Sequence, residues 1–209
     1  TYQDTQTLFA AQVLSDVLCG SNHAPLCRAI LEQGLAEDVV LGCDEQCMQP
    51  NLLLRVQNFR EADLPAIEAT IRNTLTTLCE NGLDRAQIEA SLASFEFKLR
   101  ERDYGTMPRG LVFELEILSS WLYGGDPAVR LRFGEVFDTL HAAVGTGYYE
   151  NLLRRLMLEN PHTAEVLLQP SLTCGQARQD RERESLGKTC KTLDEAQRSR
   201  IISEQERLA

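Results

Sequence analysis

Histidine and cysteine side chains are the first groups to consider for metal binding or catalysis in this sequence. The three histidines are His23, His141 and His162, and none of them has another histidine four residues away. The H-E-x-x-H pattern and its inverse, H-x-x-E-H, both need that spacing so that one helix face can present two imidazoles to a zinc ion. The sequence therefore predicts no zinc site of either kind, and we interpret the histidines as surface or capping residues.

The cysteines offer one close pair, Cys43 and Cys47, at C-x-x-x-C spacing. A structural zinc site needs about four ligands, and the sequence has no second pair at a matching spacing. We therefore interpret the pair as structural or incidental thiols. Seven cysteines are an odd number, and a chain of 209 residues needs no disulfide framework to fold, so we expect a reducing compartment, either the cytoplasm or an organellar matrix.

Other patterns that could carry chemistry have simpler structural interpretations. The segment Gly105–Gly110 resembles a glycine-rich phosphate loop, but it lacks the Lys-Ser/Thr ending and joins two expected helices. No G-x-S-x-G motif is present. Trp121 and Tyr123 are interpreted as core residues, and three carboxylates are interpreted as helix caps: Asp63, Asp84 and Asp194. We predict no catalytic, cofactor-binding or metal-binding residue in this chain.

Composition excludes further classes. The formal net charge of −10 argues against a nucleic-acid surface and against attraction to anionic membranes. The longest apolar runs are far shorter than the roughly 20 residues that a membrane span needs. The first residue is Thr1 and not Met, so we expect a processed chain or a fragment of a longer protein.

Apolar spacing indicates an α+β fold in which a small antiparallel sheet packs against several helices. Helices are expected over residues 5–19, 25–33, 63–81, 84–104, 108–123, 129–144 and 148–158, and from about 193 onward. Strands are expected over residues 38–41, 52–56 and 164–168, with a turn at 49–51 between the first two. Residues 176–209 hold many charges and few large apolar groups, which is typical of a solvated helical extension.

The stretch Asp84–Tyr123 has the strongest pattern. Asp84 and Gln87 form a capping-box pattern at its start, and Pro108 is expected both to stop the first helix and to open the second. Each helix carries an apolar face, so the two are expected to pack together as an αα unit around which the rest of the chain is organised.

Several stretches together resemble one family, the insulinase-like (pitrilysin) zinc metallopeptidases, in its presequence protease and falcilysin branch. The segment 18–35 looks like the family's "L-x-x-G-x-x-S-P-L-Y-x-x-L-I-E-x-G-L", with Cys27 where Tyr is common. Segments 82–100 and 108–127 resemble "G-F-D…A…I-E-x-x-L-R-E" and "P-R-G-L…W-x-Y-x-x-D-P". The segment 160–170 resembles "N-P-H-x-x-x-x-x-x-x-P".

The resemblance implies a parent enzyme with four related domains in two halves that close around a peptide, and with zinc on an H-x-x-E-H helix in the first domain. This chain resembles most of the second, non-catalytic domain without its opening strand (residues 1–170), followed by the start of the charged helical linker between the halves (171–209). The implied cofactor is zinc in the parent and none in this chain. The implied partners are the other domains and peptide substrates, with no nucleic acid and no membrane, and with dimerisation through an open sheet edge.

Two alternatives remain open. The chain could be a stand-alone, catalytically inactive scaffold or protein-interaction domain of the same fold. It could also be a small regulatory adaptor that uses its charged tail as a partner helix.

Overall fold

The computed structural model describes residues 4–102 and 104–208 of the chain. These residues form two compact units, one that ends at His162 and one that begins at Thr163. The first unit holds the sheet and the hydrophobic core, and the second consists of an extended segment and two helices. The expected α+β class, with a small antiparallel sheet against several helices, is confirmed.

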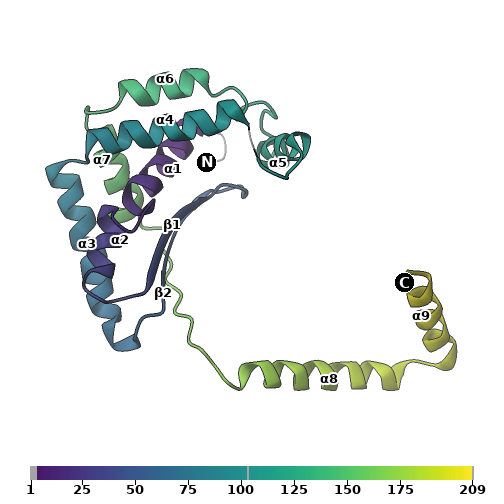
Figure 1. Ribbon diagram of the computed structural model, residues 1–209. Coiled ribbons are helices and arrows are strands. Elements are labelled where there is room, and N and C mark those ends of the chain that lie inside the picture. The colour runs from purple at the N-terminus through teal and green to yellow at the C-terminus, as the bar shows by residue number, and fades with distance from the viewer. Residues whose placement is uncertain (1–3, 103, 209) are drawn as a thin grey trace. The chain divides into compact units, whose positions relative to one another are not determined.

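Helix α1 (Thr5–Cys19) is the centre of the first unit. Asp4 caps it by accepting a hydrogen bond from the Thr7 amide at 3.0 Å, and the helix ends before Gly20, as predicted. Its buried side chains surround the helix on nearly every side, which is the pattern of a helix inside a core. The hairpin and the helices α2, α4, α6 and α7 all pack against it (Figure 1). The expectation that Asp84–Tyr123 would be the organising element was therefore wrong.

The sheet is a two-stranded hairpin, β1 (Asp38–Asp44) and β2 (Asn51–Gln57). Val39 pairs with Val56 and Leu41 with Leu54, and these side chains face the core beneath α1 and α2 (Pro25–Leu31). The alternate residues point the other way, so that Leu53 is left 58% exposed. The hairpin thus has one packed face and one open face.

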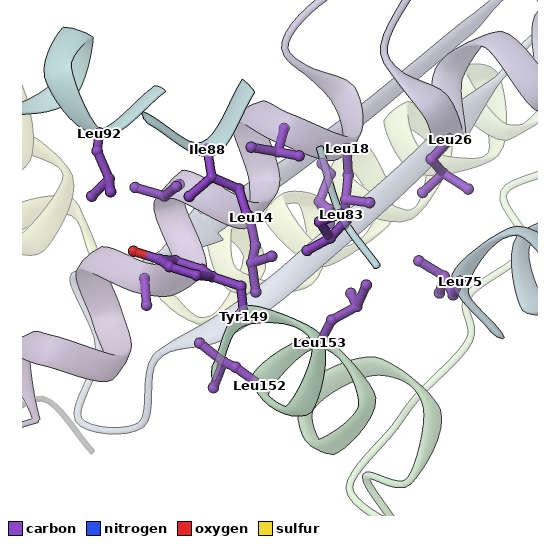
Figure 2. Packing of buried hydrophobic residues seen from close by; sticks show 14 of the residues in the cluster. Leu14, Leu18, Leu26, Leu75, Leu83, Ile88, Leu92, Tyr149, Leu152 and Leu153 are labelled. Carbon is purple, nitrogen blue, oxygen red and sulfur yellow. The ribbon is translucent and has the colours of Figure 1, made fainter. Parts of the chain in front are cut away.

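Helix α4 (Arg85–Glu101) packs against α1, and helix α3 (Leu64–Asn81) packs against α2 and α7. Figure 2 shows buried side chains converging from α1, α2, α3, α4 and α7 (Tyr148–Leu153). The junction between α3 and α4 is fastened to α7, because the Leu83 amide donates to Glu150 Oε1 at 3.0 Å. Asp84 caps α4 by accepting from the Ala86 amide at 2.9 Å, as its position in the sequence predicted.

An aromatic cluster joins α1, α4 and α6 (Gly134–Ala142). The rings of Phe9, Phe95 and Phe137 lie 5.0 to 5.5 Å apart, and Phe137 is fully buried. Helix α6 is shorter than the predicted helix 129–144, because residues 127–131 form turns that direct Arg130 into the protein. After α7 the chain continues as one π-helical segment, Arg154–Leu158.

Helix α5 (Arg109–Trp121) departs most from expectation. It does not form an αα unit with α4, because the apolar face of α4 is already occupied by α1 and α6. The break also begins earlier than Pro108: α4 ends at Glu101, its C-cap Arg102 has a left-handed φ of 53°, and Gly105 follows with a φ of 62°. Trp121 is 63% exposed, so its interpretation as a core residue was wrong.

One expected cap and one expected strand also differ. The Asp63 side chain makes no cap hydrogen bond and pairs with Arg60, because a short 3-10 turn, Glu61–Asp63, precedes α3. Residues 164–168 form no strand; Val166 and Leu168 are exposed, and no other described strand supplies the hydrogen bonds that this segment would need.

The second unit contains α8 (Cys174–Thr192) and α9 (Glu195–Leu208), with no buried side chain on the described part of either helix. The capping box of α9 is formed by Asp194 and Gln197, which exchange hydrogen bonds of 2.8 and 3.0 Å, so the expected cap at Asp194 is confirmed. The expectation of a solvated helical segment holds, and its first helix had not been foreseen.

Candidate functional site

A buried polar cluster lies where the tip of the hairpin meets the segment after α5. At its centre is Arg130, which is 7% exposed. One guanidinium nitrogen donates to the Glu45 carbonyl at 2.9 Å, and another lies 3.1 Å from Glu45 Oε2. Gln12 of α1 forms a hydrogen bond with the same carboxylate. The cluster therefore fixes the hairpin tip against α1 and against the chain between α5 and α6.

A second carboxylate, Glu116 of α5, belongs to the same electrostatic environment. Burial raises the pKa of Glu116, and the charge of Glu45 raises it further, while Arg102, Arg130 and a hydrogen bond with Tyr104 partly oppose the shift. Burial likewise raises the pKa of Glu45, against the favourable charge of Arg130. Two carboxylates near one buried arginine thus compete for the same positive charge.

The contacts of the cluster are those of a structural tie between the hairpin and the segment after α5. The Cys43 thiol on the same hairpin has a pKa raised to about 11 by burial and by the Glu45 charge, so it stays protonated at neutral pH and is a poor nucleophile or metal ligand. Arg130 makes both of its described polar contacts with Glu45. The hydroxyl of Tyr123 donates to the Gln46 carbonyl at 3.4 Å and adds a second tie between this end of α5 and the hairpin tip.

The residues considered for chemistry in the sequence are not brought together. His23 lines a shallow depression of about 230 Å³ with Arg28 and Asp84, whereas His141 Nε2 lies 3.2 Å from Glu96 Oε2 on the other side of α4. His162 is exposed. Among residues 4–102 and 104–208 there is no group of three or more His, Cys, Asp or Glu side chains placed to hold a metal ion.

The other patterns are occupied by structural contacts. The Cys47 thiol donates to the Gln49 carbonyl at 3.0 Å at the hairpin end. The Gly105–Gly110 segment is exposed and leads into the first turn of α5. None of the described helices is both long and apolar enough to cross a membrane.

The sequence did not single out Arg130, Glu45, Glu116 or Gln12. The available signal was a charged residue, Arg130, between Val129 and Leu131 in an otherwise apolar pattern. A buried position for an arginine requires an anionic partner, but the spacing along the chain does not show that the partner lies on the hairpin.

The fold is that of inactive peptidase domains. Residues 1–95 match the family model described as Peptidase M16 inactive domain. A solved protein of Bordetella pertussis, described as a zinc protease, superposes with a TM-score of 0.57 over 73% of this chain and 80% of its own, at 12% identity. The inactive peptidase domain of a protein from Bordetella parapertussis, also described as a zinc protease, gives a TM-score of 0.52 over 73% of this chain and 76% of its own, at 13% identity.

Longer relatives match at higher identity. Protein HypA of Clostridium perfringens is 32% identical over 95% of this chain, and the chloroplastic/mitochondrial presequence protease 1 of Arabidopsis thaliana is 32% identical over 80%. The chain spans 20% and 16%, respectively, of these relatives. The family resemblance is therefore confirmed: this chain carries an M16 peptidase inactive domain and is homologous to presequence proteases.

Proposed function

We propose that the chain is a non-catalytic part of a zinc-dependent metallopeptidase that degrades peptides inside a closed chamber. Residues 1–170 would form part of the chamber wall, and residues 171–209 would link the two halves of the enzyme. Two findings support this most directly. Residues 1–95 match the inactive-domain family model, and the chain as a whole is similar to longer proteins that include a presequence protease. The chain covers 16 to 20% of these relatives.

The open face of the hairpin is the surface that we assign to the chamber. Its opposite face packs within the unit, but Val40 and Leu53 remain exposed on a β surface. Such a surface can contact an extended peptide without sequence preference. The net charge of −10 would also attract basic peptides, and organellar presequences are rich in arginine.

The remaining parts of the mechanism would come from outside this chain. Zinc and the water-activating glutamate would lie in another domain of the parent, because the described residues here offer no ligand group. The partners would be those domains and the peptide substrates. We propose a reducing compartment; two relatives whose names give a location are described as chloroplastic/mitochondrial and mitochondrial.

The first experiment uses the isolated chain. We expect no zinc by plasma mass spectrometry and no cleavage of a fluorogenic presequence peptide. Chelator-sensitive cleavage by the purified chain would overturn the proposal.

The second experiment uses the parent protein that contains this chain. Leu53→Glu places a charge on the open hairpin face, and we expect a higher KM for a presequence peptide with an unchanged kcat. Phe97→Glu on α4 is the matched control, since Phe97 is 63% exposed, close to the 58% of Leu53, but lies on a helix. Equal effects of the two variants would refute the assignment of the open face. A natural reading frame no longer than this chain would instead favour the stand-alone scaffold.

A further inference from the structure

A depression of about 230 Å³ lies where the end of α1 meets the start of α2 and the junction between α3 and α4. Its apolar lining includes Val17, Leu78 and Leu83, of which Val17 is 4% and Leu83 is 7% exposed. Its polar lining consists of four exposed side chains: His23, Arg28, Asp84 and Gln87. The depression therefore combines an apolar surface with charged groups that water can reach.

The fold itself uses only one of these four polar side chains. Within residues 4–102 and 104–208, no ion pair or hydrogen bond engages the Arg28 guanidinium or the His23 imidazole. Gln87 has the position of a capping-box partner in α4, but Asp84 caps the helix alone, through the Ala86 amide at 2.9 Å. The described residues give the Gln87 side chain no hydrogen bond. These groups are therefore available to a ligand without loss of a contact within the fold.

The charges of the depression have both signs. Arg28 carries a positive charge, and the Asp84 carboxylate uses Oδ1 for the cap, which leaves Oδ2 to accept from a ligand. A simple anion would be repelled by Asp84 and a simple cation by Arg28, whereas a ligand with a carboxylate and an ammonium group can pair with both. The apolar lining adds a contact surface for an aliphatic chain.

We propose that this depression binds a free α-amino acid with an aliphatic side chain, of which leucine is the representative. Arg28 donates to the carboxylate, Asp84 accepts from the ammonium group, and Leu78 and Leu83 contact the side chain. The volume suits such a ligand, because sites for drug-sized molecules measure about 300–1,000 Å³ and this one is smaller. Since both ion pairs are exposed to water and the ligand is small, we expect a Kd of about 1–5 mM.

Proton NMR on the full chain provides the test, because the chain has three histidines whose ring signals can be followed separately. His23 lines the depression, whereas His141 pairs with Glu96 and His162 follows the π-helical segment. His23→Ala identifies the His23 signal. Leucine is added to about 30 mM at pH 7 and constant ionic strength, and we expect a saturating shift of the His23 signal alone.

Three probes each lack one of the groups that the site recognises. The probe 4-methylpentanoate lacks the ammonium group, 3-methylbutylamine lacks the carboxylate, and glycine lacks the aliphatic side chain. We expect each of them to bind at least about threefold more weakly than leucine, because each loses one exposed ion pair or the apolar contact.

Variants assign the two charges. Arg28→Gln should weaken leucine binding at least about threefold, whereas Arg72→Gln is the matched control, since Arg72 is also exposed but lies on α3 outside the depression. Asp84→Asn retains a side chain that caps helices well, so α4 stays capped. It should weaken the binding of leucine but not that of 4-methylpentanoate.

Four results would overturn the proposal. They are the lack of a saturating His23 shift, equal shifts of the His23 and His141 signals, equal effects of Arg28→Gln and Arg72→Gln, and binding of 4-methylpentanoate as tight as that of leucine. The site does not depend on the proposed role in a peptidase, so these results leave that role untouched.

Discussion

Arg130→Met tests whether the buried ion pair holds the hairpin tip in place. The substitution keeps an unbranched side chain of similar length but removes the cation and the hydrogen bond to the Glu45 carbonyl, which is 2.9 Å in the native chain. Removing one partner of a fully buried pair costs about 3–5 kcal/mol, chiefly because the remaining charge is left uncompensated. The Glu45 side chain is 32% exposed, so water screens part of its charge and lowers this free-energy cost. We expect the free energy of unfolding to fall by about 2–3 kcal/mol and Tm by about 5–10 °C.

The matched control is Arg132→Met. Arg132 lies two residues away and pairs with Asp126, but its side chain is 68% exposed. An exposed pair contributes at most about 1 kcal/mol, so the control should lower stability by less than this amount. Urea unfolding followed by circular dichroism at 222 nm compares the two variants at the same pH.

A double variant and a pH series separate charge from packing. Adding Glu45→Gln to Arg130→Met removes the uncompensated carboxylate and should restore part of the lost stability. Without Arg130 the folded-state pKa of Glu45 rises further above its unfolded value, so stability falls as pH rises through the carboxyl range. The deficit of Arg130→Met should therefore shrink between pH 7 and pH 4.5. Equal losses for Arg130→Met and Arg132→Met, or a deficit independent of pH, would refute the argument.

Three further predictions concern the Glu116 carboxyl, the buried Phe137 ring and the edges of the hairpin. Glu116→Gln should raise Tm at pH 7, and this gain in Tm should vanish in acid. The reason is that a carboxyl with a raised folded-state pKa stabilises the fold below that pKa and destabilises it above. A lower Tm at pH 7 would contradict this prediction. Phe137→Ala should lower the free energy of unfolding in urea by about 3–5 kcal/mol, against less than about 0.5 kcal/mol for the exposed Phe97→Ala on α4. The isolated chain should self-associate through its unpaired hairpin edges, and Leu53→Lys should reduce the mass measured by light scattering at high concentration; a chain that stays monomeric at high concentration would contradict it.

The elements that local patterning specifies were predictable from the sequence. Asp4 before an apolar run and Gly20 after it bound α1, and the change to a period of two located the hairpin. Capping at Asp84 was also predictable, because the cap depends on residues within one turn. These features depend on neighbours in the sequence, which a single chain displays directly.

The polar cluster could not be predicted in the same way. Glu45 and Arg130 are 85 residues apart, and their contact exists only because the hairpin tip reaches the turn after α5. The apolar pattern predicted one helix over 129–144, on which Arg130 would have been an ordinary surface position. Turns at 127–131 interrupt that helix and change the direction of the side chain.

Helix α5 shows the corresponding limit for apolar faces. Its pattern correctly predicted a helix with a broad apolar side, but a pattern cannot identify what covers that side. Four side chains of the α4–α5 connection and α5 are between 45% and 63% exposed: Met107, Leu111, Leu115 and Trp121. Within the first unit, the C-terminal end of α5 is held by Tyr123 and by the turn that contains Arg130, which both contact the hairpin. Near the N-terminal end of α5, the guanidinium of Arg102 lies 4.5 Å from the centre of the Phe113 ring. The same residues that carry the "P-R-G-L…W-x-Y-x-x-D-P" resemblance therefore position a helix whose apolar side the unit itself does not bury.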